Sequence, residues 1–143
     1  MASYAVLIGY TGIVSLIERV TGADLGLLQQ GNGIPDSPAN TSLVWLVLGI
    51  SVAAVAPLGE ELFFRAFVFR GLEIRFGFVA AALVSGLVFA AFHGNLGVAI
   101  PFFGIGVIFA WAYHASGSLW TTVAAHAIFN TVAFVATLAG VAS

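Results

Sequence analysis

The sequence predicts an all-α fold, a polytopic transmembrane bundle of about five hydrophobic helices. Hydrophobic residues make up 61% of the 143-residue chain, well above the roughly 45–50% of soluble domains. Mean hydropathy is +1.10 and only 7% of the residues are charged. The apolar residues gather in segments near the length that a bilayer requires. We therefore expect one membrane-embedded domain, residues 1–143, that crosses the cell membrane several times.

Composition excludes several other classes of protein and site. Cysteine is absent, which excludes disulfides and thiolate metal sites. The net charge is −2 and no basic run occurs, so nucleic acid is not an expected partner. The first residues lack the positive region that opens a signal peptide. We expect them to form a retained helix in contact with the lipid bilayer.

The first apolar stretch covers residues 4–17 and ends at Glu18 and Arg19. A span needs about 20 residues, so the alternatives are a tilted, thin or interfacial helix. Residues 21–41 form the one extended polar linker, rich in glycine, proline and amides. Three leucines within it allow part of the linker to lie on the membrane surface.

The second hydrophobic segment begins at Ser42 and keeps helical character to Arg75. A straight helix of this length would measure about 50 Å, against a hydrocarbon core of about 30 Å. Proline removes a backbone donor and commonly kinks or ends a helix. We therefore expect a break near Pro57.

Three further helices follow. Residues 76–77 predict a tight turn, and residues 78–96 form the third hydrophobic segment. The fourth helix starts near Pro101, where a missing N–H is harmless, and the last covers residues 119–140. Small residues recur on one face of the third and fourth helices, which allows close helix packing in a membrane. They are Ala82, Gly86 and Ala90, and then Gly106 and Ala110.

The richest polar cluster within an apolar segment is residues 60–65, Glu-Glu-Leu-Phe-Phe-Arg. An ionisable side chain at bilayer depth costs roughly 2.5–3.5 kcal/mol, so it points to function. Glu61 and Arg65 are four residues apart with the acid first, which favours a structural ion pair. Glu60 points about 100° away around the helix. Glu60 is therefore the candidate general base.

Two further clusters supply imidazoles and an amide. His93 follows Phe89 by one helical turn, and His126 and Asn130 share one face of the last helix. Singly, each fits a structural role, such as an interfacial histidine or an interhelical hydrogen-bonding pair. His114 fits an interfacial histidine, and we assign it no role. Together with Glu60, the other three are the side chains that a hydrolytic site within a membrane would use.

These three motifs, in this order, resemble those of the type II CAAX prenyl endopeptidase and bacteriocin-processing family, also called CPBP or Abi intramembrane proteases. The family pattern is E-E-x-x-x-R, then F-x-x-x-H, then H-x-x-x-N. The matching residues are Glu60, Glu61, Arg65, Phe89, His93, His126 and Asn130. The resemblance covers about residues 43–133. It is compatible with either a compact or a truncated member of a family that often has more helices.

The resemblance implies an intramembrane endopeptidase that cleaves a membrane-anchored or lipidated protein substrate. It also implies roles for the polar residues. Glu60 and His93 would hold and activate the attacking water, and His126 and Asn130 would donate to the oxyanion. The remaining acid and arginine of the first motif would orient the site. The CAAX name does not decide whether the substrate is prenylated.

Dependence on a metal is open at this stage, although the family carries a metalloprotease label. Glu60, His93 and His126 are a chemically suitable zinc set. However, the His-Glu-x-x-His helix of zinc proteases is absent. We slightly favour a metal-independent mechanism.

Two other classes of function remain open from the sequence. Glutamate and histidine chains within membranes also serve as proton relays, so one alternative is a proton- or ion-coupled transport component. The other is a non-catalytic scaffold or immunity protein on the same fold.

Overall fold

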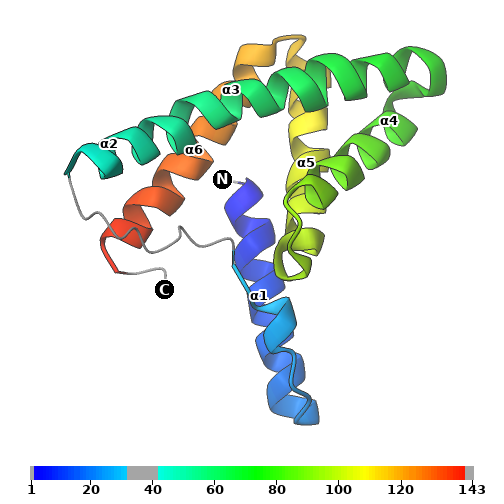
Figure 1. Ribbon diagram of the computed structural model, residues 1–143. Coiled ribbons are helices and arrows are strands. Elements are labelled where there is room, and N and C mark those ends of the chain that lie inside the picture. Colours follow the sequence, from blue (N-terminus) through cyan, green and yellow to red (C-terminus); the bar gives the residue numbers. More distant parts are fainter. Residues whose placement is uncertain (1, 32–41, 141–143) are drawn as a thin grey trace.

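The computed structural model describes residues 2–31 and 42–140, and most of this part of the chain is helical (Figure 1). The elements in order are α1 (Ala2–Thr21), the short 3₁₀ helix η1 (Gly26–Leu28), α2 (Ser42–Ile50), the π-helical η2 (Ser51–Val55), α3 (Ala56–Glu61), the π-helical η3 (Leu62–Phe69), α4 (Arg70–Phe92), α5 (Leu96–Ser116) and α6 (Leu119–Leu138). The predicted all-α bundle is confirmed. The part of the predicted linker at 32–41 lies outside the described residues.

The chain remains helical from α2 into α4 and reverses direction at Gly77. Residues 42–76 form one long helix, and the ribbon turns back sharply after it (Figure 1). Gly77 has φ 77° and ψ 172°, a conformation that a side chain would strain and glycine tolerates. Among the described residues, four helices are long and apolar enough to cross a membrane, if residues 42–92 are counted as one helix. The reversal divides that span, so the prediction of about five hydrophobic helices is confirmed.

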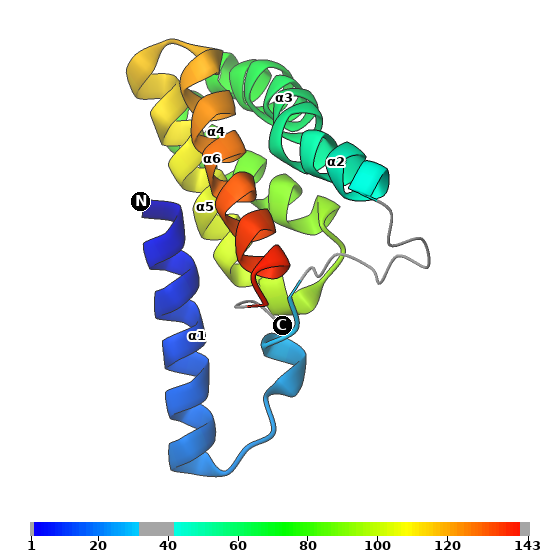
Figure 2. The ribbon, with the colours of Figure 1, turned by 90° about the vertical axis from the view of Figure 1, so that its left-hand side faces the viewer.

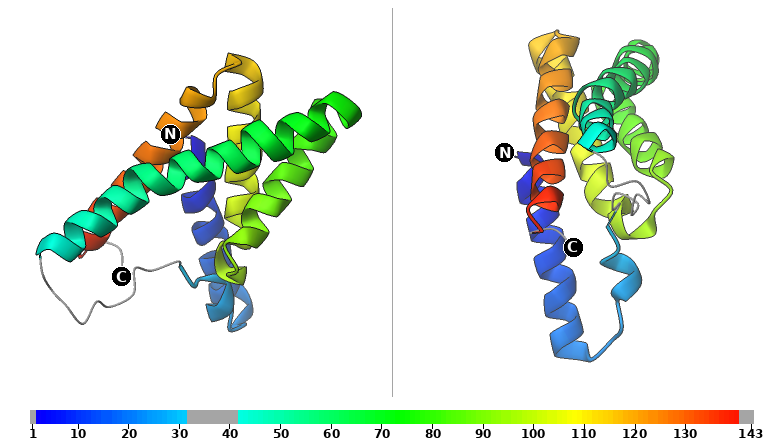
Figure 3. Two further views of the ribbon diagram at one scale, coloured as in Figure 1. Left: turned by 45° about the horizontal axis from the view of Figure 1, so that its top comes forward. Right: turned by 60° about the vertical axis from the view of Figure 1, so that its left-hand side comes forward.

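The expected break near Pro57 does not occur. The two residues before the proline have helical backbone angles. Val55 has φ −69° and ψ −48°, and Ala56 has φ −62° and ψ −51°. Instead, the hydrogen bonding widens to a π-helix over η2, just before the proline. A π-bulge directs N–H groups to acceptors five residues back, and here it accommodates the missing N–H without ending the helix. The long helix therefore lies obliquely across α5 and α6 rather than breaking (Figure 3).

The small residues predicted for helix packing do bring α4 and α5 together. Gly86, Gly106 and Ala110 are buried. A Cβ atom added to Gly106 would lie 2.8 Å from the Cα of Gly86, closer than carbon atoms pack. These glycines allow the backbones to approach directly, as membrane helices without a hydrophobic driving force require.

Helix α1 packs beside α5 and reaches α6 (Figure 2). It contains 20 residues and is apolar enough to span a membrane, so the segment predicted at 4–17 is longer than expected. The Tyr4 hydroxyl donates to the Phe129 carbonyl of α6 at 2.6 Å. The Tyr10 hydroxyl donates to the Leu28 carbonyl at 3.0 Å and holds η1 against α1.

Candidate active site

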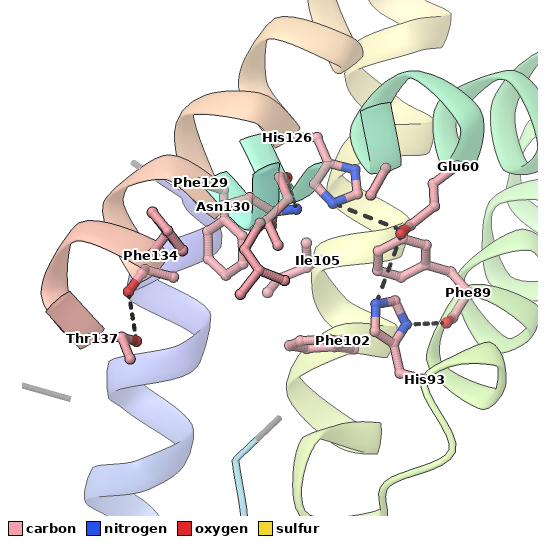
Figure 4. A pocket seen from close by; sticks show the side chains of 14 residues that line it. Glu60, Phe89, His93, Phe102, Ile105, His126, Phe129, Asn130, Phe134 and Thr137 are labelled. Carbon is pink, nitrogen blue, oxygen red and sulfur yellow. Dashed lines mark hydrogen bonds and ion pairs between the residues drawn. The ribbon is translucent and has the colours of Figure 1, made fainter. Parts of the chain in front are cut away.

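A cavity of about 390 Å³ lies between the long helix, the end of α4, α5 and α6 (Figure 4). All four residues predicted to be catalytic line it, although they come from three separate helical segments. The lining residues are Leu48, Val52, Ala56, Glu60, Phe89, His93, Phe102, Ile105, His126, Phe129, Asn130, Ala133, Phe134 and Thr137. Most of this wall is apolar, so the polar groups face one another in a setting of low polarity.

Glu60 lies between the two histidines that line the cavity. Its Oε2 atom lies 3.9 Å from Nε2 of His93 and 3.9 Å from Nε2 of His126 (Figure 4). This oxygen is buried and has no hydrogen-bond partner among the described residues. Both separations are too long for a direct hydrogen bond. They are short enough for one water molecule to contact the carboxylate and an imidazole together.

His93 follows the last residue of α4, and its hydrogen bond defines the state of its ring. Nδ1 lies 2.8 Å from the Phe89 carbonyl oxygen. A carbonyl only accepts, so Nδ1 carries the proton and donates. In the neutral ring, Nε2 is then an acceptor, and it faces Glu60. This tautomer suits a residue that holds a water molecule.

His126 is held from behind by a buried acid. Its Nδ1 donates to Oε1 of Glu61 at 2.9 Å, and Nε2 faces the cavity. The other carboxylate oxygen of Glu61 lies 3.1 Å from Nε of Arg65. The predicted Glu61–Arg65 ion pair is therefore confirmed, and the same carboxylate accepts the hydrogen bond from His126.

Arg65 has no measurable solvent exposure, and the protein supplies several compensations for its charge. Besides Glu61, the guanidinium donates to the Gly106 carbonyl of α5 at 3.3 Å. Its central carbon lies 4.7 Å from the ring centre of Phe89 and 5.3 Å from that of Phe109. Aromatic faces attract such a cation. The arginine therefore joins the first motif to α4 and α5.

Asn130 binds the long helix through a backbone group. Its Nδ2 donates to the Val52 carbonyl of η2 at 3.0 Å, which leaves one amide hydrogen and the side-chain oxygen for the cavity. Sequence reasoning missed both backbone carbonyls, those of Val52 and Gly106. Every residue has a carbonyl, so the only signal for the first was the nearby proline.

Comparison with known proteins identifies the family. Residues 41–132 match the family model described as Type II CAAX prenyl endopeptidase Rce1-like. The chain belongs to this Rce1-like family. The matched region includes all three motifs, and with them Glu60, His93, His126 and Asn130. The family and the membrane-spanning helices together show a multi-pass membrane protein.

A curated relative of this Rce1-like chain carries a peptidase name. The chain is 26% identical over 133 residues to "Putative membrane peptidase YdiL" of Bacillus subtilis (strain 168). The match covers 82% of this chain and 54% of the relative, so the chain spans about half the length of the protein it matches. No solved structure matches this chain significantly.

The donor set of this Rce1-like chain is chemically suited to zinc, but its spacing is not. Tetrahedral zinc with bonds of about 2.0–2.2 Å places its ligand atoms about 3.4 Å apart. The imidazole nitrogens of His93 and His126 each lie 3.9 Å from the Glu60 oxygen. In the part of the chain that the structure describes, no three His, Cys, Asp or Glu side chains stand close enough to hold a metal ion. The arrangement fits a water molecule better than a metal.

Proposed function

We propose that this protein is an intramembrane endopeptidase that hydrolyses a peptide bond in a membrane-anchored or lipidated substrate. One observation carries the proposal. A buried carboxylate oxygen, with no hydrogen-bond partner in the described part of the chain, lies 3.9 Å from two imidazole nitrogens inside a largely apolar cavity. The peptidase names of the family and of the relative support the same reaction class.

In the proposed reaction, Glu60 and His93 activate water. The Glu60 oxygen and the His93 Nε2 both accept hydrogen bonds, and one water has two protons to give. Its oxygen lone pairs are then free to attack a carbonyl carbon. As the C–O bond forms, one proton passes to the Glu60 carboxylate, and it is later delivered to the leaving nitrogen as the C–N bond breaks. A positioned base of this kind contributes about 10²–10⁴-fold in rate.

His126 and Asn130 are proposed to stabilise the oxyanion. The Nδ1 hydrogen of His126 is already bound to Glu61, so Nε2 can donate only when the ring is an imidazolium. Asn130 retains one amide hydrogen after binding Val52. Both donors line the same cavity as Glu60.

The apolar end of the cavity supports a membrane substrate. Leu48, Ala133 and Phe134 are among its lining residues, and Phe134 lies on the side away from Glu60 and the two histidines (Figure 4). Such a wall suits an apolar side chain or lipid anchor beside the scissile bond, with the polar residues acting on the bond itself. Cleavage of CAAX type is the finer form of this proposal, and the family description supports it.

Alanine at His126 or Asn130 is expected to lower kcat by about 10²–10³-fold with a smaller effect on KM, because oxyanion contacts strengthen in the transition state. The double variant should be less than additively impaired if both donate to one oxygen. His114→Ala is the matched control, because this exposed histidine contacts Glu73 outside the cavity. Steady-state kinetics in liposomes measure the effect. A rise in KM alone, with unchanged kcat, would show that neither residue stabilises the oxyanion.

Hydrolysis is expected to continue without bound metal. The purified protein should carry much less than one equivalent of zinc, and treatment with a chelator should leave kcat unchanged. Elemental analysis and activity assays on the same preparation provide the measurement. One equivalent of zinc, lost together with activity and restored with it, would overturn the metal-free mechanism.

The proposed function is tested by comparing the peptides released from membranes that contain the wild type or Glu60→Gln. We expect a defined set of cleaved membrane proteins with the wild type only. A transport component or a scaffold would produce the same peptides in both samples. That result would contradict the proposal.

A further inference from the structure

The carbonyl that anchors Asn130 lacks a donor within its own helix. Two backbone groups of the long helix are placed to donate to the Val52 oxygen, those four and five residues ahead. The first, the Ala56 N–H, is directed to the Ser51 carbonyl instead. The second belongs to Pro57, which has no N–H. The Val52 oxygen is thus left open at the end of the π-helical turn.

Asn130, which lies in α6, supplies the missing hydrogen-bond donor. Its side-chain nitrogen donates to the Val52 oxygen at 3.0 Å. A carbonyl acceptor requires the NH₂ end of the amide, so this contact also fixes which way the amide faces. The second hydrogen of the same nitrogen then has a defined direction relative to the cavity. The anchor joins η2 to α6 across the site.

We propose that Pro57 is a positioning residue that acts by withholding a hydrogen bond. Without a donor at position 57, the Val52 carbonyl remains available, and Asn130 is held in one orientation. The catalytic consequence rests on the proposed function, whereas the structural link between Pro57 and Asn130 does not. Pro57 is itself buried and does not line the cavity, so it acts through Asn130 rather than on a substrate.

Pro57→Ala tests the link. The new N–H at position 57 would allow the helix to relax to ordinary bonding, in which backbone groups satisfy the Val52 carbonyl. Asn130 would lose its anchor, and we expect kcat to fall about 10–100-fold with little change in KM, as small misplacements do. Pro101→Ala is the matched control, because it adds an N–H to α5 at a buried proline outside the cavity lining. It should leave kcat unchanged.

A double-mutant cycle separates positioning from general damage. In an Asn130→Ala background, Pro57→Ala should lower kcat by less than about threefold more, because the anchored group is already gone. Full additivity of the two effects would overturn the proposal. An unchanged kcat in the folded Pro57→Ala variant would also overturn the proposal. If Glu60→Gln is inactive in the same assay, the proposed peptidase function is unaffected by that result.

A second measurement does not depend on activity. The chain has four asparagines, so ¹⁵N-asparagine labelling gives few side-chain amide signals, and the Asn130 pair is assigned by its loss in Asn130→Ala. Pro57→Ala should shift that pair, and Pro101→Ala should not. An unshifted Asn130 signal in a folded Pro57→Ala protein would overturn the positioning role, whatever reaction the protein catalyses.

Discussion

Glu60→Gln is expected to lower kcat by about 10³-fold or more while leaving the protein folded. The variant keeps the size of the side chain and removes the group that accepts the proton of the water. In the wild type, the Glu60 Oε2 atom has no hydrogen-bond partner among the described residues. Because the substitution breaks no hydrogen bond of this atom and removes a buried charge, the stability of the protein should be unchanged or slightly higher. Turnover in liposomes and thermal unfolding in detergent measure the two effects separately.

The matched control for this variant is Glu73→Gln. Glu73 is also a helical glutamate, but it contacts Arg70 and His114 outside the cavity. Its substitution should leave kcat unchanged. Full activity in the Glu60 variant would exclude this residue as the base and, with it, the proposed mechanism.

Glu61→Gln is expected to have the largest effect on stability, about 3–5 kcal/mol of the free energy of unfolding. The change leaves the charge of Arg65 buried without its counter-ion, which is far more costly than breaking an exposed pair. It also weakens the contact that holds His126. Chemical unfolding in mixed micelles gives the measurement, and Glu73→Gln should cost only about 0–1 kcal/mol because Arg70 is exposed.

The cause of that loss can be checked by removing the other charge. Adding Arg65→Met to the Glu61 variant should recover much of the lost stability, because an apolar side chain replaces the unpaired cation. If the double variant were as unstable as the sum of the two single changes, an uncompensated charge would not be the explanation.

Local parts of the site could be predicted from the sequence, because they depend on spacing within one helix. The four-residue interval between Glu61 and Arg65 predicted their ion pair, which forms at 3.1 Å. The approach of α4 and α5 was likewise visible in the small residues, since a glycine face has few other uses in a membrane helix. These predictions needed no knowledge of how distant segments meet.

Contacts between segments could not be predicted in the same way. The motifs placed Glu60 and His126 on separate helices, but spacing along each helix does not determine the 3.9 Å between their side chains. The general rule for proline predicted a break at Pro57, and the structure shows a continuous helix instead. A donor from 78 residues away satisfies the Val52 carbonyl, so a tertiary contact overrides the local preference.

Hydrolysis in ¹⁸O-labelled water by the purified protein in liposomes, followed by mass spectrometry of the products, tests the water-activated reaction. The substrate would be one identified by the comparison of released membrane peptides. The wild type should produce a new carboxyl terminus that carries ¹⁸O, and Glu60→Gln should produce none above background. Absence of cleavage by the folded wild type, or equal labelling by Glu60→Gln, would contradict a peptidase in which Glu60 activates water.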